Sequence, residues 1–305
     1  MSFPQKTEIV IGLPIYNNST FLIKALESLR QQTHPLFSVV MLDDCSEDDS
    51  PQIAMQYADM DNRFHYYRND SRQGLASSWR MVFELSKAKF RNMKFFAWAS
   101  DHDLWDKYWI EKLLPIINKK DCVLAYPLAQ RIDESDHCIP HDIRKGIYST
   151  NDSKNVVKRF KSITDLKSNF GNMVYGLFRA SALSQAGIFR NTLLPDRLLI
   201  HEIVLLGNIL QIEDVLWYRR FRKKITLNSQ ANSLWPHVKP WYGRLPWEWV
   251  HSFFLVKHQS AFLKTSYPQS WHIHIILTQL AFAMKNFIHR TLKRMSKRIK
   301  ASLFF

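Results

Sequence analysis

The sequence predicts an α/β protein with a mostly parallel central sheet, helices on both faces of that sheet and a C-terminal helical extension. Short apolar runs alternate with segments of helical periodicity through the first 130 residues, as in strands joined by crossover helices. The 305 residues are 46% hydrophobic and 13% aromatic, which is enough for a large core. The 8 glycines never form a G-x-G pair, which argues against a dinucleotide fingerprint, a P-loop and a kinase glycine loop.

The first 130 residues contain five expected strands and four expected helices in alternation. The strands are expected over residues 8–13, 37–42, 64–67, 94–98 and 122–126. The helices are expected over residues 20–30, 51–60, 75–87 and 106–118. Ser19 is the candidate cap of the first helix, and Pro51 is typical of the first turn of the second.

The pattern after residue 130 is less regular. Residues 133–172 are polar and are expected to form a loop or flap. A strand over 173–179, a helix over 197–210 and an edge strand over 215–221 follow. Residues 228–249 carry four of the ten tryptophans with three prolines, and their periodicity predicts no element. We therefore expect one domain over residues 1–225, with halves 1–130 and 131–225, and an extension over 226–305.

The net charge of +15 is concentrated at the C-terminal end. Residues 1–150 hold 18 Lys/Arg and 20 Asp/Glu, whereas residues 151–305 hold 24 and 7, and nine basic but no acidic residues follow Glu248. Apolar residues recur at helical spacing from Ile273 to Ile299, with six Lys/Arg between 285 and 298 on the other face. Such a helix suits an anionic membrane surface, and no nucleic-acid partner is expected. The alternative is that the apolar stripe packs on the preceding domain.

Three further observations indicate a cytoplasmic protein, which the C-terminal helix would place peripherally on the cytoplasmic face of a membrane. Cys45, Cys122 and Cys138 are odd in number and show no C-x-x-C spacing, which argues against a disulfide framework or a zinc site. The N-terminal sequence predicts no signal peptide. The longest apolar stretch, 273–284, is too short to span a bilayer.

Acidic residues follow two of the expected strands. Asp43-Asp44 ends the second strand, and Asp101-His102-Asp103 follows the fourth. In parallel sheets ligands bind beyond the carboxyl ends of the strands, and carboxylates there can bridge Mg²⁺ or Mn²⁺ to phosphates. His102 is interpreted as a spacer, since no second His or Cys stands near it in sequence. Loop solvation is the competing interpretation for both acidic segments.

Several motifs then resemble the inverting family 2 glycosyltransferases, whose nucleotide-sugar-binding fold is called GT-A. Residues 9–33 and 39–50 are similar to the opening of that family at Pro14, Tyr16, Asn17, Gln32, Thr33, Asp43, Asp44 and Ser46. NDSRQGLASSW resembles a later glycine segment, and WASDHDLWDKYWIEKLL resembles the metal motif with its helix. YGLFRASALSQAGIF, LLPDRLLIHEIVLLGNI and LWYRRF resemble the acceptor half of one bacterial subgroup. The resemblance covers roughly residues 8–222.

The resemblance implies roles for individual residues. Pro14, Tyr16 and Asp44 would contact the nucleoside, Arg72 would help hold the nucleotide, and Asp101 would lie beside the ribose. Asp103 would hold the metal, and Asp196 would be the catalytic base, with Glu202 as the second choice. From sequence alone Asp196 is as well explained as a helix cap. The chain departs from the family at His102, and in KKITLNSQANSLWPH, where the histidine loop of the family is not obvious.

The function that the resemblance implies is an inverting, metal-assisted transfer of a sugar (a hexosyl transfer). The donor would be a nucleoside diphosphate sugar, a UDP-sugar first of all, and the acceptor a glycan or lipid-linked glycan of cell-envelope polysaccharide biosynthesis. Residues 1–130 would bind the donor and 131–225 the acceptor, with Mg²⁺ or Mn²⁺ as cofactor. The alternatives are a nucleotidyltransferase, a non-enzymatic basic protein that binds a membrane or nucleic acid, and an inactive relative of the glycosyltransferases.

Overall fold

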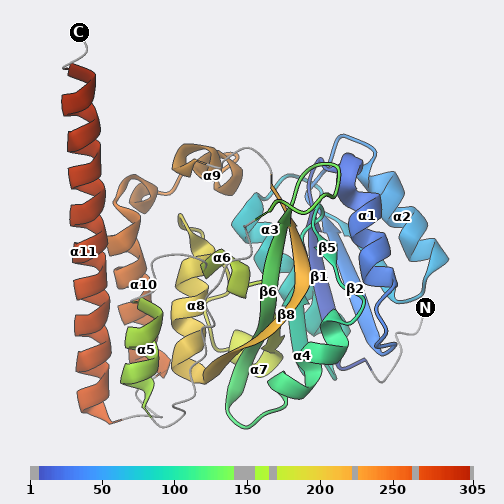
Figure 1. Cartoon of the computed structure of the whole chain (residues 1–305), viewed down its shortest axis with the longest axis horizontal. Coiled ribbons are helices and arrows are strands. Elements are labelled where there is room, and N and C mark those ends of the chain that lie inside the picture. Colours follow the sequence, from blue (N-terminus) through green and yellow to red (C-terminus); the bar gives the residue numbers. More distant parts are fainter. Residues whose placement is uncertain (1–6, 141–154, 165–169, 222–225, 263–267, 303–305) are drawn as a thin grey trace.

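A computed structural model describes residues 7–140, 155–164, 170–221, 226–262 and 268–302, and it has the expected α/β architecture (Figure 1). One eight-stranded sheet runs in the order β3-β2-β1-β4-β7-β6-β8-β5, with helices on both faces. Helices α10 and α11 lie together at the end of the molecule away from α1 and α2. The predicted fold class is confirmed.

The first half of the sheet is parallel, as predicted. Its strands are β1 (Ile9–Ile15), β2 (Phe37–Asp43), β3 (Phe64–Arg68) and β4 (Phe95–Trp98). The connecting helices are α1 (Ser19–Arg30), α2 (Ser50–Met60) and α3 (Leu75–Lys89). Because β1 pairs in parallel with both β2 and β4, the carboxyl ends of these three strands meet at one edge.

Two details of this half differ from the sequence-based expectations. Asn18, not Ser19, occupies the cap position of α1, and the backbone N–H of Ser19 donates to the Asp48 carboxylate at 2.8 Å. Asp48 thus satisfies a free N–H at the helix start from another segment, which periodicity does not reveal. The fourth helix, α4 (Trp109–Ile117), begins later than predicted, after a turn that ends at Tyr108, and Leu104–Trp105 form a short strand, β5, paired with β8.

The second half of the sheet is mixed. It contains β6 (Cys122–Ile132), β7 (Leu177–Arg179) and β8 (Asn208–Arg220). β7 is antiparallel to β4 and β6, whereas β6 and β8 are parallel. The prediction of an edge strand over 215–221 is wrong, because β8 lies between β6 and β5. The strand predicted over 173–179 is also shorter, since Met173 ends a helical turn.

Helices also form within the segment predicted to be a loop. They are α5 (Val156–Thr164) and α6 (Phe170–Met173), while residues 141–154 and 165–169 lie outside the described part. Val156, Phe160 and Ile163 stand at helical spacing and are fully buried, which explains why α5 forms. α7 (Ala180–Leu183) and α8 (Pro195–Leu206) follow, and α8 packs against α5.

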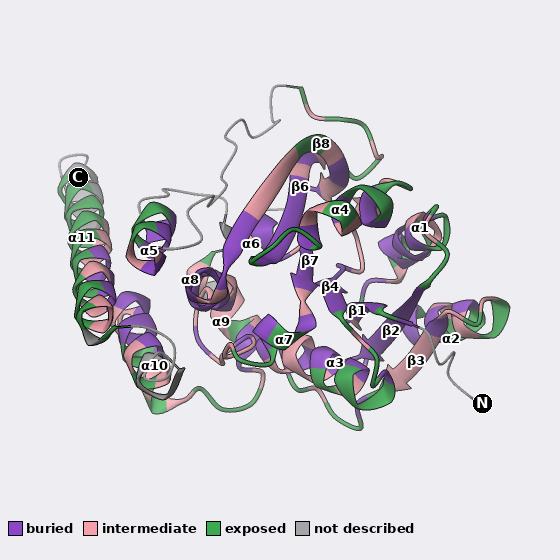
Figure 2. Cartoon of the chain, turned by 90° about the horizontal axis from the view of Figure 1, so that it is seen from below, coloured by how far each residue is buried: buried purple, intermediate pink, exposed green. Residues whose placement is uncertain are grey.

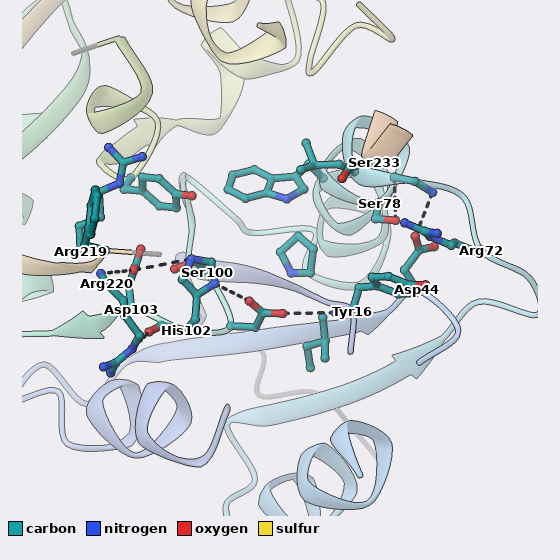
Figure 3. A pocket seen from close by; sticks show the side chains of 18 of the residues that line it. Tyr16, Asp44, Arg72, Ser78, Ser100, His102, Asp103, Arg219, Arg220 and Ser233 are labelled. Carbon is teal, nitrogen blue, oxygen red and sulfur yellow. Dashed lines mark hydrogen bonds and ion pairs between the residues drawn. The ribbon is translucent and has the colours of Figure 1, made fainter. Parts of the chain in front are cut away.

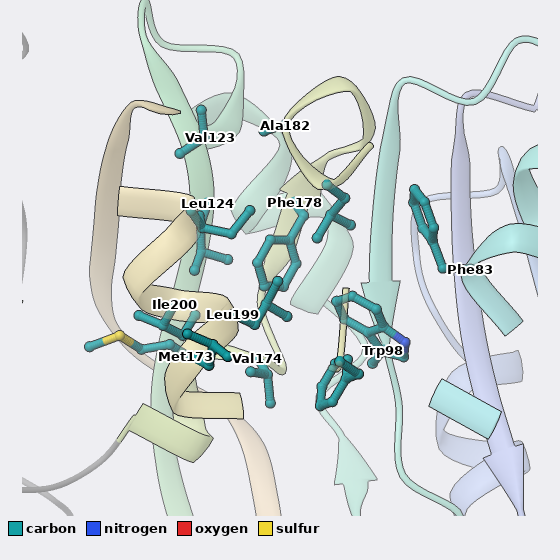
Figure 4. Close-up of a cluster of buried hydrophobic side chains, with 14 of the residues drawn as sticks. Phe83, Trp98, Val123, Leu124, Met173, Val174, Phe178, Ala182, Leu199 and Ile200 are labelled. Atoms are coloured by element: carbon teal, nitrogen blue, oxygen red, sulfur yellow. The ribbon is translucent and has the colours of Figure 1, made fainter. Parts of the chain in front are cut away.

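The core lies on both faces of the sheet. One cluster gathers side chains of α3, β4, β7 and α8, among them Phe83, Trp98, Phe178 and Leu199 (Figure 4). The second packs α1 and α4 against the other face, with Leu26 and Leu113 fully buried. Burial on both faces is why the strands of the first half are almost continuously apolar.

The Trp-rich segment and the extension are helical. They contain α9 (Leu227–Leu234), a 3₁₀ turn η1 (Trp241–Arg244), α10 (Trp247–Phe262) and α11 (Gln269–Ser302). α10 packs against α8 and α11, and α11 also contacts α5, so the extension is docked on the sheet domain (Figure 2). The long C-terminal helix matches its predicted position. Within the described ranges, no helix is both long and apolar enough to cross a membrane.

Candidate functional site

A pocket of about 630 Å³ opens at the carboxyl edge of β1, β2 and β4. Figure 3 shows Tyr16, Asp44 and Arg72 toward one end of it and Asp103 and Arg219 toward the other. Every residue predicted to contact the donor or the metal lines this one pocket, namely Pro14, Tyr16, Asp44, Arg72, Asp101 and Asp103. Residues up to 89 positions apart in the sequence therefore converge there, as the strand-end argument predicts.

Asp44 anchors the loop that forms one end of the pocket. One carboxylate oxygen accepts from Asn69 Nδ2 and the backbone N–H of Gln73, both at 2.8 Å, and the other accepts from the N–H of Gly74 at 2.9 Å. Gly74 has φ +86°, and a Cβ there would lie 2.7 Å from Pro236 Cδ. Only glycine therefore fits between Asp44 and the segment that follows α9. Contact of Asp44 with a nucleoside stays a prediction.

Tyr16 and Arg72 form a stacked wall beside Asp44. The Arg72 guanidinium lies 4.1 Å from the centre of the Tyr16 ring, a cation–π arrangement that fixes both side chains. The Arg72 carbonyl also contacts Nε2 of His237 at 2.8 Å. A histidine after the Tyr-Arg-Arg strand therefore does reach the pocket wall, although its place in the sequence was not obvious. An aromatic ring and a guanidinium plane are suited to stack on the flat ring of a nucleobase.

The turn after β1 is locked to the turn after β2. Asn17, with φ +45°, donates its backbone N–H to Ser46 Oγ at 3.0 Å, and its side-chain oxygen accepts from the N–H of Glu47 at 2.8 Å. Asn tolerates this left-handed backbone better than most residues. This explains why Asn17 and Ser46 accompany the residues that line the pocket.

The segment 101–103 is held on two sides. Asp101 accepts from the backbone N–H of Tyr16 at 3.3 Å and contacts His102 Nδ1 at 2.7 Å. Asp103 accepts from the N–H of Arg220 at 2.7 Å and from Trp217 Nε1 at 3.0 Å, both on β8. His102 is more than a spacer, because its other ring nitrogen lies 3.8 Å from Asp103 and the imidazole thus spans the two carboxylates.

Asp103, the residue that the resemblance assigns to the metal, has carboxylate oxygens that could hold a divalent cation. Each of its oxygens accepts one protein hydrogen bond, which leaves one lone pair on each oxygen for a further ligand. No group of three or more His, Cys, Asp or Glu side chains placed to hold a metal occurs among the described residues. A single carboxylate that shares the ion with phosphate oxygens is a common arrangement for Mg²⁺. The donor set therefore fits a metal brought together with a diphosphate.

Asp196 lies beside the pocket rather than in its lining. It is the second residue of α8, while Leu194 holds the cap position, so the helix-cap explanation of Asp196 is not supported. Its Oδ1 is buried and accepts no hydrogen bond from the described residues. Burial raises its pKa, and a backbone N–H and the charges of Arg197 and Arg219 oppose that shift. A Cβ on Gly171 would lie 2.9 Å from its Oδ2, so the glycine leaves room for the carboxylate.

Glu202, the second choice for the base, is engaged elsewhere. Its carboxylate accepts from Arg190 Nε at 2.8 Å and from the backbone N–H of Gly187 at 2.5 Å, and it does not line the pocket. Burial raises its pKa, and Arg190 opposes the shift. Glu202 therefore ties α8 to the preceding turn, and its geometry does not favour a catalytic role.

The pocket lining also contains side chains that were assigned no role from the sequence, among them Trp79, Arg131, Tyr175, Arg219 and Phe221. Burial raises the pKa of the Tyr175 phenol, and the charges of Asp103 and Asp196 raise it further, so Tyr175 lies near both carboxylates. Arg219 Nη1 donates to Asn172 Oδ1 at 3.2 Å. Trp79, Tyr175 and Arg219 stand in segments that carry the family resemblance, but nothing in the sequence assigned a role to any of them.

Comparison with known sequences places these motifs in one family. Residues 10–181, more than half of the chain, match the model of "Glycosyl transferase family 2". TuaG of Bacillus subtilis, named a teichuronic acid biosynthesis glycosyltransferase, is 26% identical over 121 residues, or 40% of this chain and 46% of TuaG. GlyG of Streptococcus pneumoniae, a glycosyltransferase, is 25% identical over 128 residues, or 42% of this chain and 41% of GlyG. The matches thus span less than half the length of these relatives.

Solved structures share the fold over most of the chain. S. aureus TarS 1–349 in complex with UDP-GlcNAc has a TM-score of 0.60 at 14% identity, covering 91% of this chain and 73% of that one. The mannosyltransferase PcManGT of Pyrobaculum calidifontis, in complex with GDP-Man and Mn²⁺, has a TM-score of 0.53 at 12% identity, covering 98% and 81%. These likenesses are to GT-A folds. The fold, the order of the motifs and the matched residues agree: this chain belongs to glycosyl transferase family 2.

Proposed function

We propose that this chain is an inverting glycosyltransferase that moves a sugar from a nucleoside diphosphate sugar to a hydroxyl group. One observation carries the proposal: all six residues predicted for the donor and the metal line the same pocket. Family membership favours this reaction over a nucleotidyltransferase or a non-enzymatic nucleic-acid-binding protein. TarS with UDP-GlcNAc and PcManGT with GDP-Man support a nucleotide-sugar donor, and a UDP-sugar is the first candidate.

The two ends of the pocket suggest how the donor lies in it. Tyr16, Arg72 and Asp44 offer a stacking surface and an acceptor oxygen at one end, which suits the nucleoside. Asp101 lies between the nucleoside end and the diphosphate end of the pocket, where the ribose is expected. Arg219 and Asp103 at the other end suit the diphosphate, since a guanidinium and a carboxylate-bound cation both neutralise phosphate charge. Mg²⁺ or Mn²⁺, if held by Asp103 and the diphosphate, would stabilise the charge on the leaving group.

Asp196 is proposed as the base that takes the proton of the acceptor hydroxyl. Its carboxylate has a buried oxygen without a hydrogen bond from the described residues, and it lies near Tyr175 and Arg219 on the wall formed by the second half of the chain. A raised pKa brings a carboxyl closer to neutral pH, where general-base catalysis is most effective. One base on the far side of the sugar suffices for a single displacement, so the anomeric configuration inverts.

The acceptor is proposed to be a glycan or lipid-linked glycan of the cell envelope. The teichuronic acid pathway named for TuaG supports a polysaccharide product. Asp196, Tyr175 and Arg219 all come from residues after 131, in agreement with the expected acceptor half. The boundaries 1–225 and 226–305 stay a proposal.

The test is to supply a panel of nucleotide sugars with and without Mn²⁺ and to measure release of the nucleoside diphosphate. One sugar and one nucleotide should be turned over above the rest, and Mn²⁺ should accelerate the release. Proton NMR of the first-formed product should show the anomeric configuration opposite to that of the donor. Retention of configuration would exclude the single displacement. Absence of turnover with every donor and with added glycan acceptors would favour an inactive relative.

A further inference from the structure

The outward side of α11 carries a continuous apolar surface, which we call the outer stripe. Its members share one face of the helix and are each between 38% and 60% exposed: Ile273, Leu277, Leu280, Met284, Ile288, Leu292, Met295 and Ile299. At 1.5 Å per residue the stripe is about 40 Å long. Scattered exposed apolar residues are ordinary, whereas a contiguous stripe of this length marks an interaction surface.

α11 is held on the domain by a different face. Ile275, Phe282 and Ala283 are buried against the neighbouring helices, and Gln279 Nε2 donates to Ser252 Oγ of α10 at 3.2 Å. The alternative raised by the sequence, that the apolar stripe packs on the domain, is therefore wrong for the outer-stripe residues. Their exposure is not needed for docking the helix, so another partner must account for it.

The charge of the same helix indicates what that partner is. Residues 285–300 contain seven Lys/Arg, and no acidic residue follows Glu248 anywhere in the chain. Lys285 and Lys293 are exposed, and Arg290 donates to Glu248 of α10 at 2.8 Å, so Arg290 belongs to the docking of the helix. An exposed apolar face flanked by basic residues is the pattern of helices that lie in the interface of an anionic bilayer.

A second copy of the chain fits the stripe less well. Paired helices of this kind need opposite charges beside the apolar seam, because like charges there repel each other. α11 has no acidic residue to offer, so pairing two copies would bring their basic residues together. An anionic lipid surface complements the charge instead.

We propose that α11 lies flat on an anionic membrane, with the outer stripe inserted at the level of the headgroups and its basic residues contacting acidic lipids. The helix then holds the domain at the surface without spanning the bilayer. α11 packs on α5, and α5 packs on α8, so the pocket and Asp196 keep a fixed orientation toward the membrane. A basic residue near such a surface strengthens binding about fivefold.

The experiment is flotation of the full-length chain with vesicles of phosphatidylglycerol and phosphatidylcholine, and with phosphatidylcholine alone. The chain should float with the anionic vesicles and be released by raised salt. The triple variant Leu277→Gln, Met284→Gln, Ile288→Gln should lose binding. The triple variant Lys293→Gln, Lys297→Gln, Lys300→Gln should weaken it about 100-fold. Truncation before α11 is a poorer test, because it would also uncover the residues of α10 that α11 buries.

Matched controls make these outcomes decisive. Ile23→Gln, Leu36→Gln and Met60→Gln remove three equally exposed apolar side chains from the other end of the molecule, and should leave binding unchanged. The second control variant combines Lys87→Gln, Lys119→Gln and Lys120→Gln. It removes three exposed positive charges outside α11 and should also leave binding unchanged. Because ten of these twelve positions are exposed, thermal melting should stay close to that of the parent. Equal loss in variants and controls, or no flotation of the parent, would overturn the proposal. So would a dimer that becomes monomeric when the outer stripe is changed while flotation persists.

Discussion

Asp44 lines the pocket and Asp196 lies beside it, yet the two carboxylates are hydrogen-bonded in very different ways. In the parallel half, Asp44 accepts three protein hydrogen bonds, and Asp101 and Asp103 are likewise bonded to neighbouring segments. In the second half, Asp196 keeps a buried oxygen without a hydrogen bond from the described residues, and burial raises its pKa.

The difference in hydrogen bonding separates a carboxylate that shapes the pocket wall from one that is available for reaction. A carboxylate that accepts several N–H bonds fixes the backbone around it and stays in place. A buried carboxylate oxygen without a hydrogen bond costs folding free energy, which is tolerated where a proton has to be taken. We therefore propose that Asp44 shapes the pocket and that Asp196 takes part in the chemistry, and variants of the two residues should behave differently.

The largest effect is expected for Asp196→Asn. Removing a general base lowers kcat by about 10²–10⁴. Donor affinity, measured by titration with the nucleoside diphosphate, should stay within a few-fold of the parent, because Asp196 does not line the pocket. In the parent, burial raises the pKa of Asp196, so kcat should begin to rise with pH only above the range of an ordinary aspartate. A collapse of donor affinity instead would place Asp196 in the donor site.

The next effect is expected for Asp103→Asn, with Asp101→Asn as the matched control. Loss of the cation that stabilises the leaving group should lower kcat by about 10²–10³ and abolish the gain from Mn²⁺. Asp101→Asn should retain that gain, since Asp101 is bound to Tyr16 and His102 rather than proposed as a metal ligand. Circular dichroism checks that Asp103→Asn, which loses one acceptor toward β8, is still folded. Equal metal dependence in both variants would contradict the assignment.

The two halves also differ in how far the sequence predicts them. In the parallel half the site residues directly follow strands, so strand prediction alone locates Asp44, Asp101 and Asp103 on one edge. Tyr175 and Arg219 meet only because β7 and β8 pair with β6 across a mixed sheet, and apolar periodicity does not specify such pairing. Tyr175 and Arg219 were not predicted as pocket residues for that reason.

Short helices within polar segments were missed on similar grounds. α5 has only three fully buried apolar residues, and its partners α8 and α11 follow much later in the chain. The outer stripe of α11 was visible as periodicity, but the sequence did not distinguish it from the face that packs. A helix with two apolar faces, one buried and one exposed, can be divided only once its neighbours are known.

A smaller effect, on stability, is expected at the docking of α11. Glu248 is fully buried and pairs with Arg290 at 2.8 Å. Arg290→Met removes a guanidinium and leaves the buried carboxylate weakly compensated, so it should lower the free energy of unfolding by about 3 kcal/mol, the low end for such pairs, because Arg197 also acts on Glu248. Glu248→Gln should cost less, since the Arg290 side chain is partly exposed and can remain hydrated. Urea unfolding measures both; the reverse order would contradict this account.

The smallest effect is expected on the melting temperature of Asp196→Asn. The sign of this change is the most direct test of the comparison between Asp44 and Asp196. Between the ordinary pKa of aspartate and its raised value in the fold, the folded protein binds a proton that the unfolded chain has lost. The contribution of Asp196 to stability therefore falls as pH rises through this interval, and at high pH it is a net cost. Asparagine has no charge to bury, so the variant should melt about 1–3 °C above the parent at pH 8 and lose this advantage near pH 4.

Asp44→Asn should shift the melting temperature in the opposite direction. The carboxylate of Asp44 accepts N–H bonds on both oxygens, and an amide would turn its own NH₂ toward one of those donors, either Gly74 or the pair Asn69 and Gln73. A donor facing a donor in a buried site loses a hydrogen bond and gains none, which costs about 1–3 kcal/mol. Differential scanning calorimetry of both variants at the two pH values measures whether each melting temperature rises or falls relative to the parent. If both variants melt higher at pH 8, Asp44 is as weakly bonded as Asp196, and the distinction between wall and reactive group fails.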